Sequence, residues 1–273
     1  MDQLRERVAI VTGGSSGIGL GIAGQLAVSG CKVVIVGRTL STLEAAAQTI
    51  GATAIQADVT DLAQVHRLAR QVSDLFGRVD ILVNNAGVGP TAPLSQMTAS
   101  DWQWMVQANL WSVTNGLEVF LPLLMDNPNG GHIVNTSSIA GMFTAPEIGA
   151  YSASKYAVTA LTEALAQELS AAGSQVGVSL FLPGPVRSNI HEGGRNRPAW
   201  ARDGKLRDTR LEDAPGFENV VIPWMEPDKA GAIVVDAIRR NRLYVWTHPE
   251  GTQPILDRFN RIRRSIEEAQ EGR

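Results

Sequence analysis

The chain of 273 residues is 44% hydrophobic and 19% charged, with a formal net charge of −3 at neutral pH. This composition is typical of a globular protein, and it offers no basic patch for nucleic acid. No apolar run approaches the roughly 20 residues that cross a bilayer, and the polar N-terminus does not resemble a signal peptide, so we expect a cytoplasmic protein without a membrane partner. The single cysteine and the four scattered histidines show no ligand spacing, and hence no metal site is expected.

Short β-branched runs alternate with longer helical patterns along most of the chain. The strand runs are apolar at nearly every position, as in strands that a parallel sheet buries on both faces. The alternation predicts an α/β fold: one doubly wound Rossmann-type domain over residues 1–273, with a seven-stranded parallel sheet and helices on both faces. The predicted strands are 8–11, 32–36, 54–57, 81–83, 132–135, 175–181 and 243–246, and the predicted helices lie near 18–29, 40–49, 61–75, 100–124, 151–172 and after 227.

A glycine-rich turn, Thr12-Gly13-Gly14-Ser15-Ser16-Gly17-Ile18-Gly19, follows the first predicted strand. Its spacing differs from the common G-x-G-x-x-G fingerprint, but it meets the same needs: a tight turn, a close approach to a pyrophosphate and close packing of helix on strand. The helix that begins near Gly17 directs its first amides at the phosphates. We therefore expect the dinucleotide site to contain Gly13, Ser15, Ser16, Gly17, Ile18 and Gly19.

The second predicted strand ends in Val36-Gly37-Arg38-Thr39, where a chain that binds NAD would carry an acid for the ribose diol. Arg38 can instead pair with a 2′-phosphate, with Thr39 beside it, so the pattern favours NADP(H) over NAD(H). The glycine-rich turn offers serines rather than a second basic residue, which leaves NAD(H) open. After the third and fourth strands, we expect Asp58 and Val59 at the adenine, and Asn85, Ala86 and Gly87 along the cofactor.

Tyr151 and Lys155 lie four residues apart, and therefore on one face of the helix predicted at 151–172. A nearby ammonium lowers the pKa of a phenol from its usual value of about 10, so that the tyrosine can exchange a proton with a substrate oxygen near neutral pH. Ser138 follows the fifth strand and stands thirteen residues before Tyr151. Ser137 and Tyr156 are the competing serine and tyrosine, but no lysine stands four residues after Tyr156.

The alternation stops between residues 187 and 226, where about forty residues carry no strand pattern. Loops of this length in compact domains are usually functional, so we expect a substrate lid over 187–226, and a solvated, partly disordered insertion is the alternative. The tail over 254–273 has the apolar spacing of a helix, and it covers either a neighbouring subunit or the chain's own sheet edge. Its apolar residues are Ile255, Leu256, Phe259, Ile262 and Ile266.

In their order and spacing these motifs resemble the short-chain dehydrogenase/reductase family, in its branch of about 250 residues. The resemblance runs from about Arg7 to Trp246. It implies a seven-stranded sheet and a catalytic tetrad. It rests on residues 12–19, Asp58, residues 84–87, the pair Pro183-Gly184, and the four tetrad residues Asn109, Ser138, Tyr151 and Lys155, all in order.

The resemblance also implies what each tetrad residue does. Tyr151 exchanges a proton with the substrate oxygen, which Ser138 holds by a hydrogen bond. Lys155 lowers the pKa of Tyr151 and binds the nicotinamide ribose, while Asn109 supports a water that links Lys155 to solvent. The residues implied beside the nicotinamide are Pro183, Gly184 and Val186, with Ser188 at the carboxamide or the phosphates.

The substrate pocket is expected between the loop after Ser138 and the lid, and it is largely apolar. Such a cavity suits a ketone or secondary alcohol with a bulky or aromatic group. Residues 186–190, 225–227 and 248–250 are similar to bacterial aryl-ether alcohol dehydrogenases of lignin breakdown, although those enzymes carry an acid where this chain has Arg38. The expected lining residues are Ala140, Met142, Phe143, Glu147, Ile148, Pro185, Ile190, Trp200, Phe217 and Trp224.

These features predict an NADP(H)-dependent oxidoreductase that interconverts a ketone and a secondary alcohol, with Tyr151 as acid and base. A 3-oxoacyl-(acyl carrier) reductase shares the tetrad and is the first alternative. A non-catalytic NADP-binding sensor is the second, although such sensors usually lose the tyrosine or the lysine. The predicted helices at 100–124 and 151–172 carry more apolar residues than one buried face requires, and the resemblance implies a homodimer or homotetramer.

Overall fold

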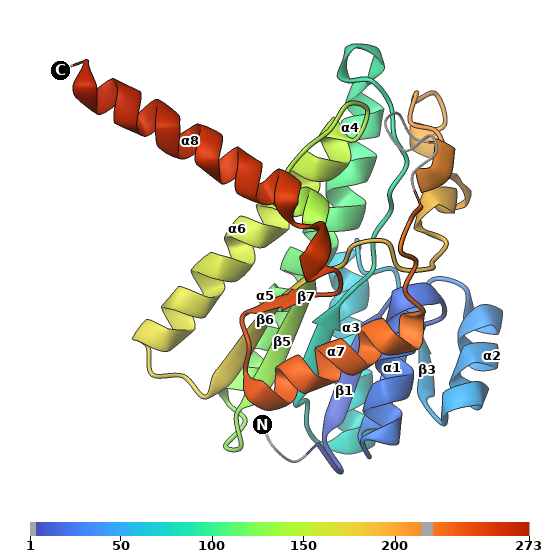
Figure 1. The fold of residues 1–273 in the computed structure, drawn as a ribbon. Helices are drawn as coiled ribbons and strands as arrows, with labels where there is room; N and C mark the ends of the chain where they lie inside the picture. The colour runs from blue at the N-terminus through green and yellow to red at the C-terminus, as the bar shows by residue number, and fades with distance from the viewer. Residues whose placement is uncertain (1–3, 214–220, 273) are drawn as a thin grey trace.

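A seven-stranded, all-parallel sheet forms the centre of the molecule in the computed structural model, which describes residues 4–213 and 221–272 (Figure 1). The strand order is β3-β2-β1-β4-β5-β6-β7, so the sheet grows in opposite directions from β1 and from β4. The predicted seven-stranded parallel sheet is confirmed, with every strand end within one residue of its expected position. The strands are β1 (Val8–Thr12), β2 (Lys32–Gly37), β3 (Thr53–Gln56), β4 (Ile81–Asn84), β5 (Gly131–Thr136), β6 (Val176–Leu182) and β7 (Tyr244–Trp246).

Helices cover both faces of this sheet, because successive residues of a strand point to opposite sides. Their bounds are α1 (Gly17–Val28), α2 (Leu40–Ile50), α3 (Leu62–Phe76), α4 (Ala99–Val106), α5 (Ser112–Met125), α6 (Gly149–Ala171), α7 (Pro227–Arg240) and α8 (Gln253–Glu271). Ile10 of β1 packs into a core that α3, α5 and α6 complete, whereas its neighbour Val11 packs into a second core with α1, α2 and α7. The structure thus confirms the doubly wound architecture.

Helices α1 and α7 lie side by side on one face of the sheet (Figure 1). A Cβ atom on Gly21 would lie 2.2 Å from the carbonyl oxygen of Pro227, and one on Gly231 would lie 2.3 Å from that of Gly21. Side chains at these two positions would collide with backbone, so the contact requires glycine. The contact fixes the position of α1, whose first turn belongs to the site described below.

The helix predicted at 100–124 is not one regular helix. Helix α4 ends at Val106, a π-helical turn spans Gln107–Trp111, and α5 begins at Ser112. The apolar pattern of the sequence continues on both sides of the turn, and it therefore gives no sign of the interruption. Such turns occur frequently at functional sites, and Asn109 lies in this one.

The described part of residues 187–226 contains no strand of the sheet, as predicted, but it has local structure. Short 3₁₀ turns occur at Ile190–Asn196, Ala199–Ala201 and Leu211–Asp213. Single β-bridges join Thr91 to Arg207 and Val186 to Met225. Phe217, an expected pocket residue, lies outside the described residues.

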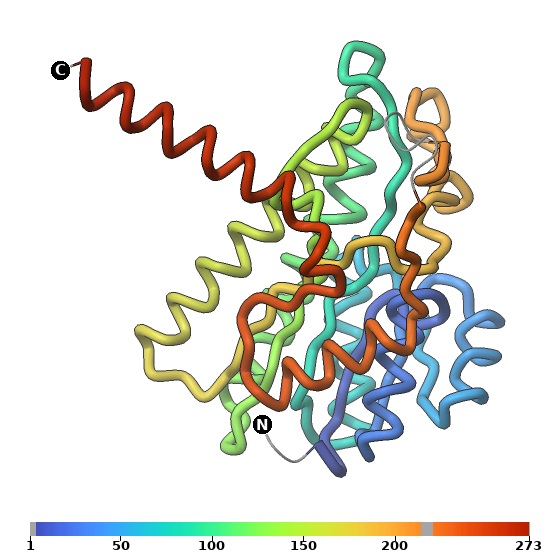
Figure 2. Tube along the Cα trace, viewed as in Figure 1, coloured from blue at the N-terminus to red at the C-terminus, as the bar shows by residue number. Residues whose placement is uncertain are grey.

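Helix α8 begins after β7 and extends away from the rest of the molecule (Figure 2). The predicted helical spacing of the tail is therefore confirmed. Within the two described ranges, no helix is both long and apolar enough to span a bilayer.

Candidate active site

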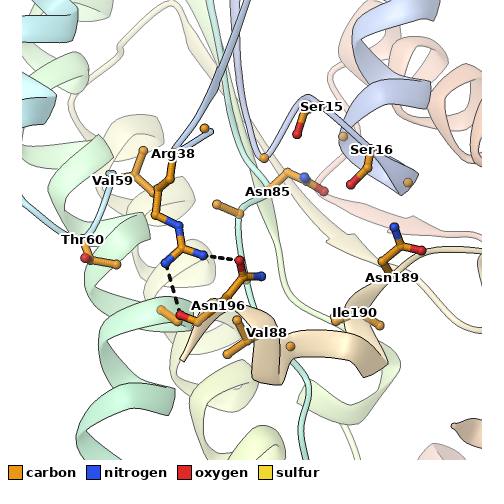
Figure 3. A pocket seen from close by; sticks show the side chains of 18 of the residues that line it. Ser15, Ser16, Arg38, Val59, Thr60, Asn85, Val88, Asn189, Ile190 and Asn196 are labelled. Carbon is orange, nitrogen blue, oxygen red and sulfur yellow. Dashed lines mark hydrogen bonds between the residues drawn. The ribbon is translucent and has the colours of Figure 1, made fainter. Parts of the chain in front are cut away.

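A groove of about 680 Å³ runs along the carboxyl ends of several strands (Figure 3). It lies at the switch point between the neighbouring strands β1 and β4, from which the sheet extends in opposite directions. Ligands of open parallel sheets bind at such a position. The structure brings together here residues that the sequence predicts from separate strand ends. The expected cofactor residues that line the groove are Gly13, Ser15, Ser16, Gly17, Ile18, Gly19, Arg38, Thr39, Asp58, Val59, Asn85, Ala86, Gly87, Tyr151, Lys155, Pro183 and Ser188.

Two expected cofactor residues, Gly184 and Val186, are not among the described residues that line the groove. Val186 is buried in the core shared with α1 and α7. The backbone N–H of Gly184 donates to Oγ1 of Thr247 at 2.8 Å. Their contact with a nicotinamide stays a prediction.

The glycine-rich turn has the geometry that a pyrophosphate needs. Gly13 and Gly17 have positive φ angles of 65° and 52°, which favour glycine. A Cβ atom on Gly19 would lie 2.2 Å from the carbonyl oxygen of Gly13, so α1 begins directly against the turn. The Ser16 side chain makes no capping hydrogen bond, which leaves the first amides of α1 for a phosphate. The residues of the turn therefore fit a dinucleotide.

Thr12 ties this turn to the end of β4. Its hydroxyl oxygen accepts hydrogen bonds from the backbone N–H groups of Asn85 (2.9 Å) and Ala86 (3.0 Å). The side-chain amide of Asn85 donates in return to the Thr12 carbonyl at 3.0 Å. Thr12 is not among the expected contact residues. The structure shows that it holds two loops together and does not line the groove.

The described part of residues 187–226 forms the opposite wall of the groove and is called the lid below for its position; that it covers a substrate stays a prediction (Figure 3). The guanidinium of Arg38 donates to the backbone carbonyl of Asn196 at 3.3 Å and to its side-chain oxygen. The residue expected at a 2′-phosphate thus also holds the lid. The lid residues that line the groove are Ser188, Asn189, Ile190, Gly193, Arg195, Asn196, Pro198 and Trp200.

Arg195 of the lid brings a second basic side chain to the groove, in addition to Arg38. The glycine-rich turn supplies no basic side chain. Its Nη1 donates to the backbone carbonyls of Asn189 (3.1 Å) and Glu192 (3.0 Å) and to the Glu192 carboxylate (3.2 Å). The side chain is about half exposed, at 46%. Arg195 is one of several mixed charges in a segment without regular periodicity, so no sequence signal distinguishes it.

The structure separates the roles of the two neighbouring serines. Ser138 hydrogen-bonds to the Tyr151 side chain, and its hydroxyl also accepts from the backbone N–H of Ala140 at 3.1 Å. The Ser137 hydroxyl instead donates to the Lys155 carbonyl at 2.8 Å and contacts the hydroxyl of Thr159 at 2.9 Å. Ser137 therefore supports the backbone of α6, while Ser138 is the serine beside the phenol. Of the two, Ser137 is the one among the residues that line the groove, so the role of Ser138 toward a substrate stays a prediction.

Lys155 is buried and Tyr151 is half-buried at the groove, and desolvation is the largest influence on both pKa values. Burial raises the pKa of Tyr151 above its ordinary value of 10.0, and the hydrogen bond from Ser138 opposes this shift. Burial lowers the pKa of Lys155 from 10.5 to about 8. The Lys155 Nζ donates to the Thr136 carbonyl at 3.0 Å and lies 5.8 Å from the centre of the Tyr151 ring.

The raised pKa of Tyr151 is opposite to the lowering that the family resemblance implies. The physical reason is that desolvation of the phenolate outweighs the hydrogen bond from Ser138, while the Lys155 ammonium is turned toward the Thr136 carbonyl. The competing Tyr156 lies apart, with the Arg258 guanidinium 5.2 Å from its ring.

Asn109 links three parts of the site from within the π-turn. Its Oδ1 accepts from the backbone N–H of Val88 at 2.8 Å, and its Nδ2 lies 3.0 Å from both the Val88 carbonyl and the Ser154 hydroxyl. A Cβ atom on Gly87 would lie 2.9 Å from Asn109 Oδ1 and 3.5 Å from Lys155 Nζ, which places both side chains at the same loop. The water expected beside Asn109 stays a prediction.

Of the expected substrate residues, Ile190 and Trp200 line the groove. Trp224 instead stacks beside Arg187, whose guanidinium lies 5.7 Å from its ring. A role for these residues toward a substrate stays a prediction. The other expected residues that the structure describes, and that do not line the groove, are Ala140, Met142, Phe143, Glu147, Ile148 and Pro185.

A buried carboxylate, absent from the sequence predictions, anchors the lid. Asp101 of α4 accepts hydrogen bonds from the backbone N–H groups of Lys205 (2.7 Å) and Leu206 (3.1 Å), and it lies 3.5 Å from the Arg197 guanidinium. Arg197 also stacks at 4.7 Å over the ring of Trp104. Burial alone would raise the Asp101 pKa, but these backbone hydrogen bonds and those from Thr98 lower it below 3.8. The T-x-x-D capping pattern at 98–101 is visible in the sequence. The sequence does not show that the Asp101 carboxylate also accepts hydrogen bonds from the backbone of the lid.

No group of three or more His, Cys, Asp or Glu side chains among residues 4–213 and 221–272 has an arrangement that suits a metal ion.

Comparison with known proteins finds relatives that are all named dehydrogenases or reductases. Residues 7–198 match the family model described as short chain dehydrogenase. A "CLA biosynthesis dehydrogenase/reductase" from Lactiplantibacillus plantarum is 31% identical over 271 residues, which cover 96% of this chain and 95% of the relative. A "C alpha-dehydrogenase" from Sphingobium sp. is 32% identical over 273 residues, which cover 97% of this chain and 88% of the relative.

A solved structure has the same architecture. The crystal structure of a short-chain dehydrogenase/reductase from Burkholderia phymatum in complex with NAD matches with a TM-score of 0.89 and 33% identity, and the match covers 97% of both chains. The apo form of LigD from Sphingobium sp. matches with a TM-score of 0.78 and 28% identity, over 96% of this chain and 98% of the other.

Proposed function

Since the chain belongs to the short-chain dehydrogenase family, and is thus an oxidoreductase of alcohol and carbonyl groups, we propose that it interconverts a ketone and a secondary alcohol with NADP(H). One observation carries the proposal: Tyr151, hydrogen-bonded to Ser138, lines the same groove as the glycine-rich turn. A cofactor held at its phosphates and a substrate oxygen held at the phenol therefore share one cavity.

The cofactor, when bound, supplies the hydride for the carbonyl carbon. Ser138 and Tyr151 hold the carbonyl oxygen by hydrogen bonds. Because burial raises the pKa of Tyr151, the phenol is protonated at neutral pH and can donate its proton as negative charge develops on that oxygen. Lys155, with a pKa of about 8, is mostly charged at neutral pH and stabilises the phenolate that remains. Oxidation of the alcohol uses the same groups in reverse.

Two basic side chains support NADP(H) over NAD(H). Arg38 stands where a free ribose diol would need an acid, and Arg195 brings a further cation to the groove from the lid. The Burkholderia phymatum structure is a complex with NAD, so the cofactor preference of this chain requires its own measurement.

Apolar lid residues support a bulky or aromatic substrate. Ile190 and Trp200 line the groove that also contains Tyr151. The Sphingobium relative is named a C alpha-dehydrogenase, which agrees with an alcohol on a substituted carbon. Apolar pockets with a few polar groups bind substrates of this kind.

The test measures oxidation of NADPH and of NADH by absorbance with a panel of aryl and alkyl ketones. Wild-type protein is compared with Tyr151→Phe, and Tyr156→Phe is the matched control. We expect kcat to fall by about 10² to 10⁴-fold in Tyr151→Phe and to stay within twofold in Tyr156→Phe. We expect kcat/KM to be higher with NADPH than with NADH.

Each contrary result has a definite meaning. Equal activity of wild type and Tyr151→Phe would contradict the assigned acid. Activity on 3-oxoacyl thioesters of an acyl carrier, with none on free ketones, would support the carrier-linked reductase instead. Binding of NADPH without turnover of any substrate would support the sensor.

A further inference from the structure

A buried histidine, His248, follows the last strand of the sheet and takes no part in the reaction proposed above. It is 4% exposed, and its neighbour Thr247 is 5% exposed. Neither is among the described residues that line the groove. Buried polar side chains require hydrogen-bond partners, so the partners of this pair show what it holds in place.

The hydrogen bonds of this pair form a chain across three segments. The backbone N–H of Gly184 donates to Oγ1 of Thr247 at 2.8 Å. This Oγ1 lies 2.7 Å from Nδ1 of His248, whose Nε2 lies 2.8 Å from the carbonyl oxygen of Pro223. Gly184 follows β6, the pair follows the neighbouring strand β7, and Pro223 belongs to the lid.

The partners fix the direction of each bond. A carbonyl oxygen only accepts, so the contact with Pro223 assigns the ring proton of His248 to Nε2. Nδ1 of the neutral ring is then an acceptor. The Thr247 oxygen already accepts from Gly184, and its hydroxyl proton is donated to Nδ1. An imidazole suits this place because it accepts at one edge and donates at the other.

The ring also packs directly against the turn after β6. A Cβ atom on Gly184 would lie 2.8 Å from Nδ1 and 3.1 Å from Cγ of His248. Because hydrogen bonds hold both ring nitrogens, the ring is not free to swing aside, and the contact requires glycine. The pair Pro183-Gly184 thus has a structural partner at Thr247, which lies 63 residues beyond Gly184 in the chain.

The segment that this chain of bonds holds, residues 183–188, connects two parts of the groove. Pro183 and Ser188 line the groove. The Pro183 carbonyl accepts from the backbone N–H of Ile139 at 3.1 Å, in the short turn after β5. A Cβ atom on Gly17 would lie 2.9 Å from Cβ of Ser188, so the other end of the segment contacts the glycine-rich turn.

The end of the lid returns to the same segment. The N–H of Met225 donates to the Pro185 carbonyl, and the N–H of Arg187 donates to the Met225 carbonyl, both at 2.9 Å. Pro223 stands two residues before this pairing, and His248 holds its carbonyl. The histidine therefore joins the returning end of the lid to the wall of the groove.

We propose that His248 is a positioning residue for the cofactor. With Thr247 it fixes residues 183–188 between the end of β7 and the end of the lid, and it thereby sets the wall against which a dinucleotide binds. The proposal rests on the cofactor site proposed above, but it requires neither a particular substrate nor a 2′-phosphate. His248 acts through the backbone, so its loss weakens cofactor binding without removing an acid or a base.

A binding test compares Thr247→Val with Thr247→Ser. Valine has the shape of threonine without its hydroxyl, and it leaves the Gly184 N–H and the His248 Nδ1 without partners, whereas serine keeps the hydroxyl. The Kd for NADPH is measured by fluorescence titration in the absence of substrate. We expect it to rise about five- to fiftyfold in Thr247→Val and to stay within about threefold of wild type in Thr247→Ser.

A second buried pair of a histidine and a hydroxyl provides the matched control. Nε2 of His132 lies 2.9 Å from Oγ of Ser179, which donates to the Arg242 carbonyl. Neither His132 nor Ser179 is among the described residues that line the groove. Ser179→Ala should lose folding stability in chemical denaturation, as Thr247→Val does, but leave the Kd for NADPH unchanged. An equal rise in Kd in the two variants would overturn the proposal.

The wall can also be tested without any cofactor. Arg187 has a side chain that is 59% exposed, but its backbone N–H is bonded to Met225, so trypsin cleavage after it requires the segment to open. His248→Asn keeps an acceptor toward Thr247 and is too short to reach Pro223. We expect this cut, identified by mass spectrometry, to become about five- to fiftyfold faster in Thr247→Val and His248→Asn. Thr247→Ser and Ser179→Ala should stay near wild type.

The two proposals fail in different ways. If wild-type protein bound neither NADPH nor NADH, the proposed function would fail, and the role of His248 toward a cofactor would fail with it. If wild type and Thr247→Val bound NADPH equally tightly, the role of His248 alone would be overturned. Equal cleavage after Arg187 in wild type, Thr247→Val and His248→Asn would overturn the link between the histidine and the wall.

Discussion

The floor and the lid of the groove are built from different kinds of contact. The floor consists of strand ends and helix starts that are joined to their immediate neighbours in the sheet. The Gly13 N–H donates to the Val36 carbonyl, and the Thr12 and Asn85 side chains each bond to backbone groups of the other strand end. The lid consists of short turns that attach to distant elements through side chains, at Asp101 and at Arg38.

The two lid attachments also differ from each other. The Asp101 carboxylate is fully buried, with Arg197 only 10% exposed beside it, whereas Arg38 and Asn196 meet in an exposed contact. A buried charged contact is costly to break, and an exposed one contributes little. The lid is thus held more firmly at Asp101 than at Arg38, which borders the groove.

The largest effect is expected from removing the firm attachment. Asp101→Ala leaves the Arg197 guanidinium without its carboxylate and two backbone N–H groups without an acceptor, which we expect to destabilise the lid by about 3 kcal/mol or more. Trypsin cleavage after Arg202 and Lys205 should become about a hundredfold faster, while cofactor binding at the floor changes less.

Asp203→Ala is the control for this variant, because Asp203 is an exposed lid carboxylate bonded to the Ser100 hydroxyl. Its cleavage rate should stay near that of wild type. Since the folded pKa of Asp101 is below 3.8, the lid of wild-type protein should resist an acid protease such as pepsin down to about pH 4 and lose that resistance as the pH falls further. Equal cleavage of Asp101→Ala and wild type would contradict the firm attachment.

A second prediction concerns the buried lysine of the floor. The Lys155 pKa is about 8 in the folded protein and 10.5 ordinarily, so between these values the unfolded chain holds a proton that the folded chain has lost. The contribution of Lys155 to the free energy of unfolding should therefore rise with pH over this range, by on the order of 3 kcal/mol in total, while the Cys31 thiol, whose pKa burial raises from 9.0 to about 11, contributes in the opposite direction in wild type and variant alike. Chemical denaturation of wild type and of Lys155→Met at pH 7.5 and 10 measures the difference, and the variant should lack this rise. An equal rise in both proteins would count against a buried, perturbed lysine.

A third prediction concerns the close contact inside the glycine-rich turn. Gly19→Ala places a Cβ atom 2.2 Å from the Gly13 carbonyl, and backbone must move to relieve the clash. We expect a loss of about 1–3 kcal/mol in stability and a tenfold or greater rise in the Kd for NADPH. Gly24→Ala is the matched control on the same helix, because its Cβ atom would meet only an Ile50 methyl group at 3.6 Å. It should leave the Kd unchanged.

The smallest effect is expected at the loose attachment. Asn196→Ala removes a side-chain acceptor from Arg38 in an exposed contact, so folding stability should change by less than about 1 kcal/mol. The Kd for NADPH should change by a few-fold, and that for NADH by less, when both are measured by fluorescence titration. A tenfold or greater change in the Kd of the folded protein for both NADPH and NADH would show that the two lid attachments do not differ as described.

Much of the fold was predictable because its signals are local. Apolar β-branched runs and helical spacing arise from neighbours within a few residues, and they predicted all seven strands. The glycine-rich turn and the Tyr151–Lys155 spacing are equally local, so the groove residues they predict are brought together in the structure. The sequence also predicted a helical tail, without indicating that it extends away from the rest of the molecule.

The tertiary structure alone decided the features that depend on distant partners. Arg38 and Asn196 are 158 residues apart in the chain, and Asp101 meets Lys205 and Leu206 over gaps of 104 and 105 residues. No periodicity or motif connects such residues. The direction of the Tyr151 pKa shift belongs to the same class, because it depends on how completely the folded chain removes water from the phenol and from the lysine beside it. Local spacing places charges near one another, but only the packed structure sets how strongly they interact.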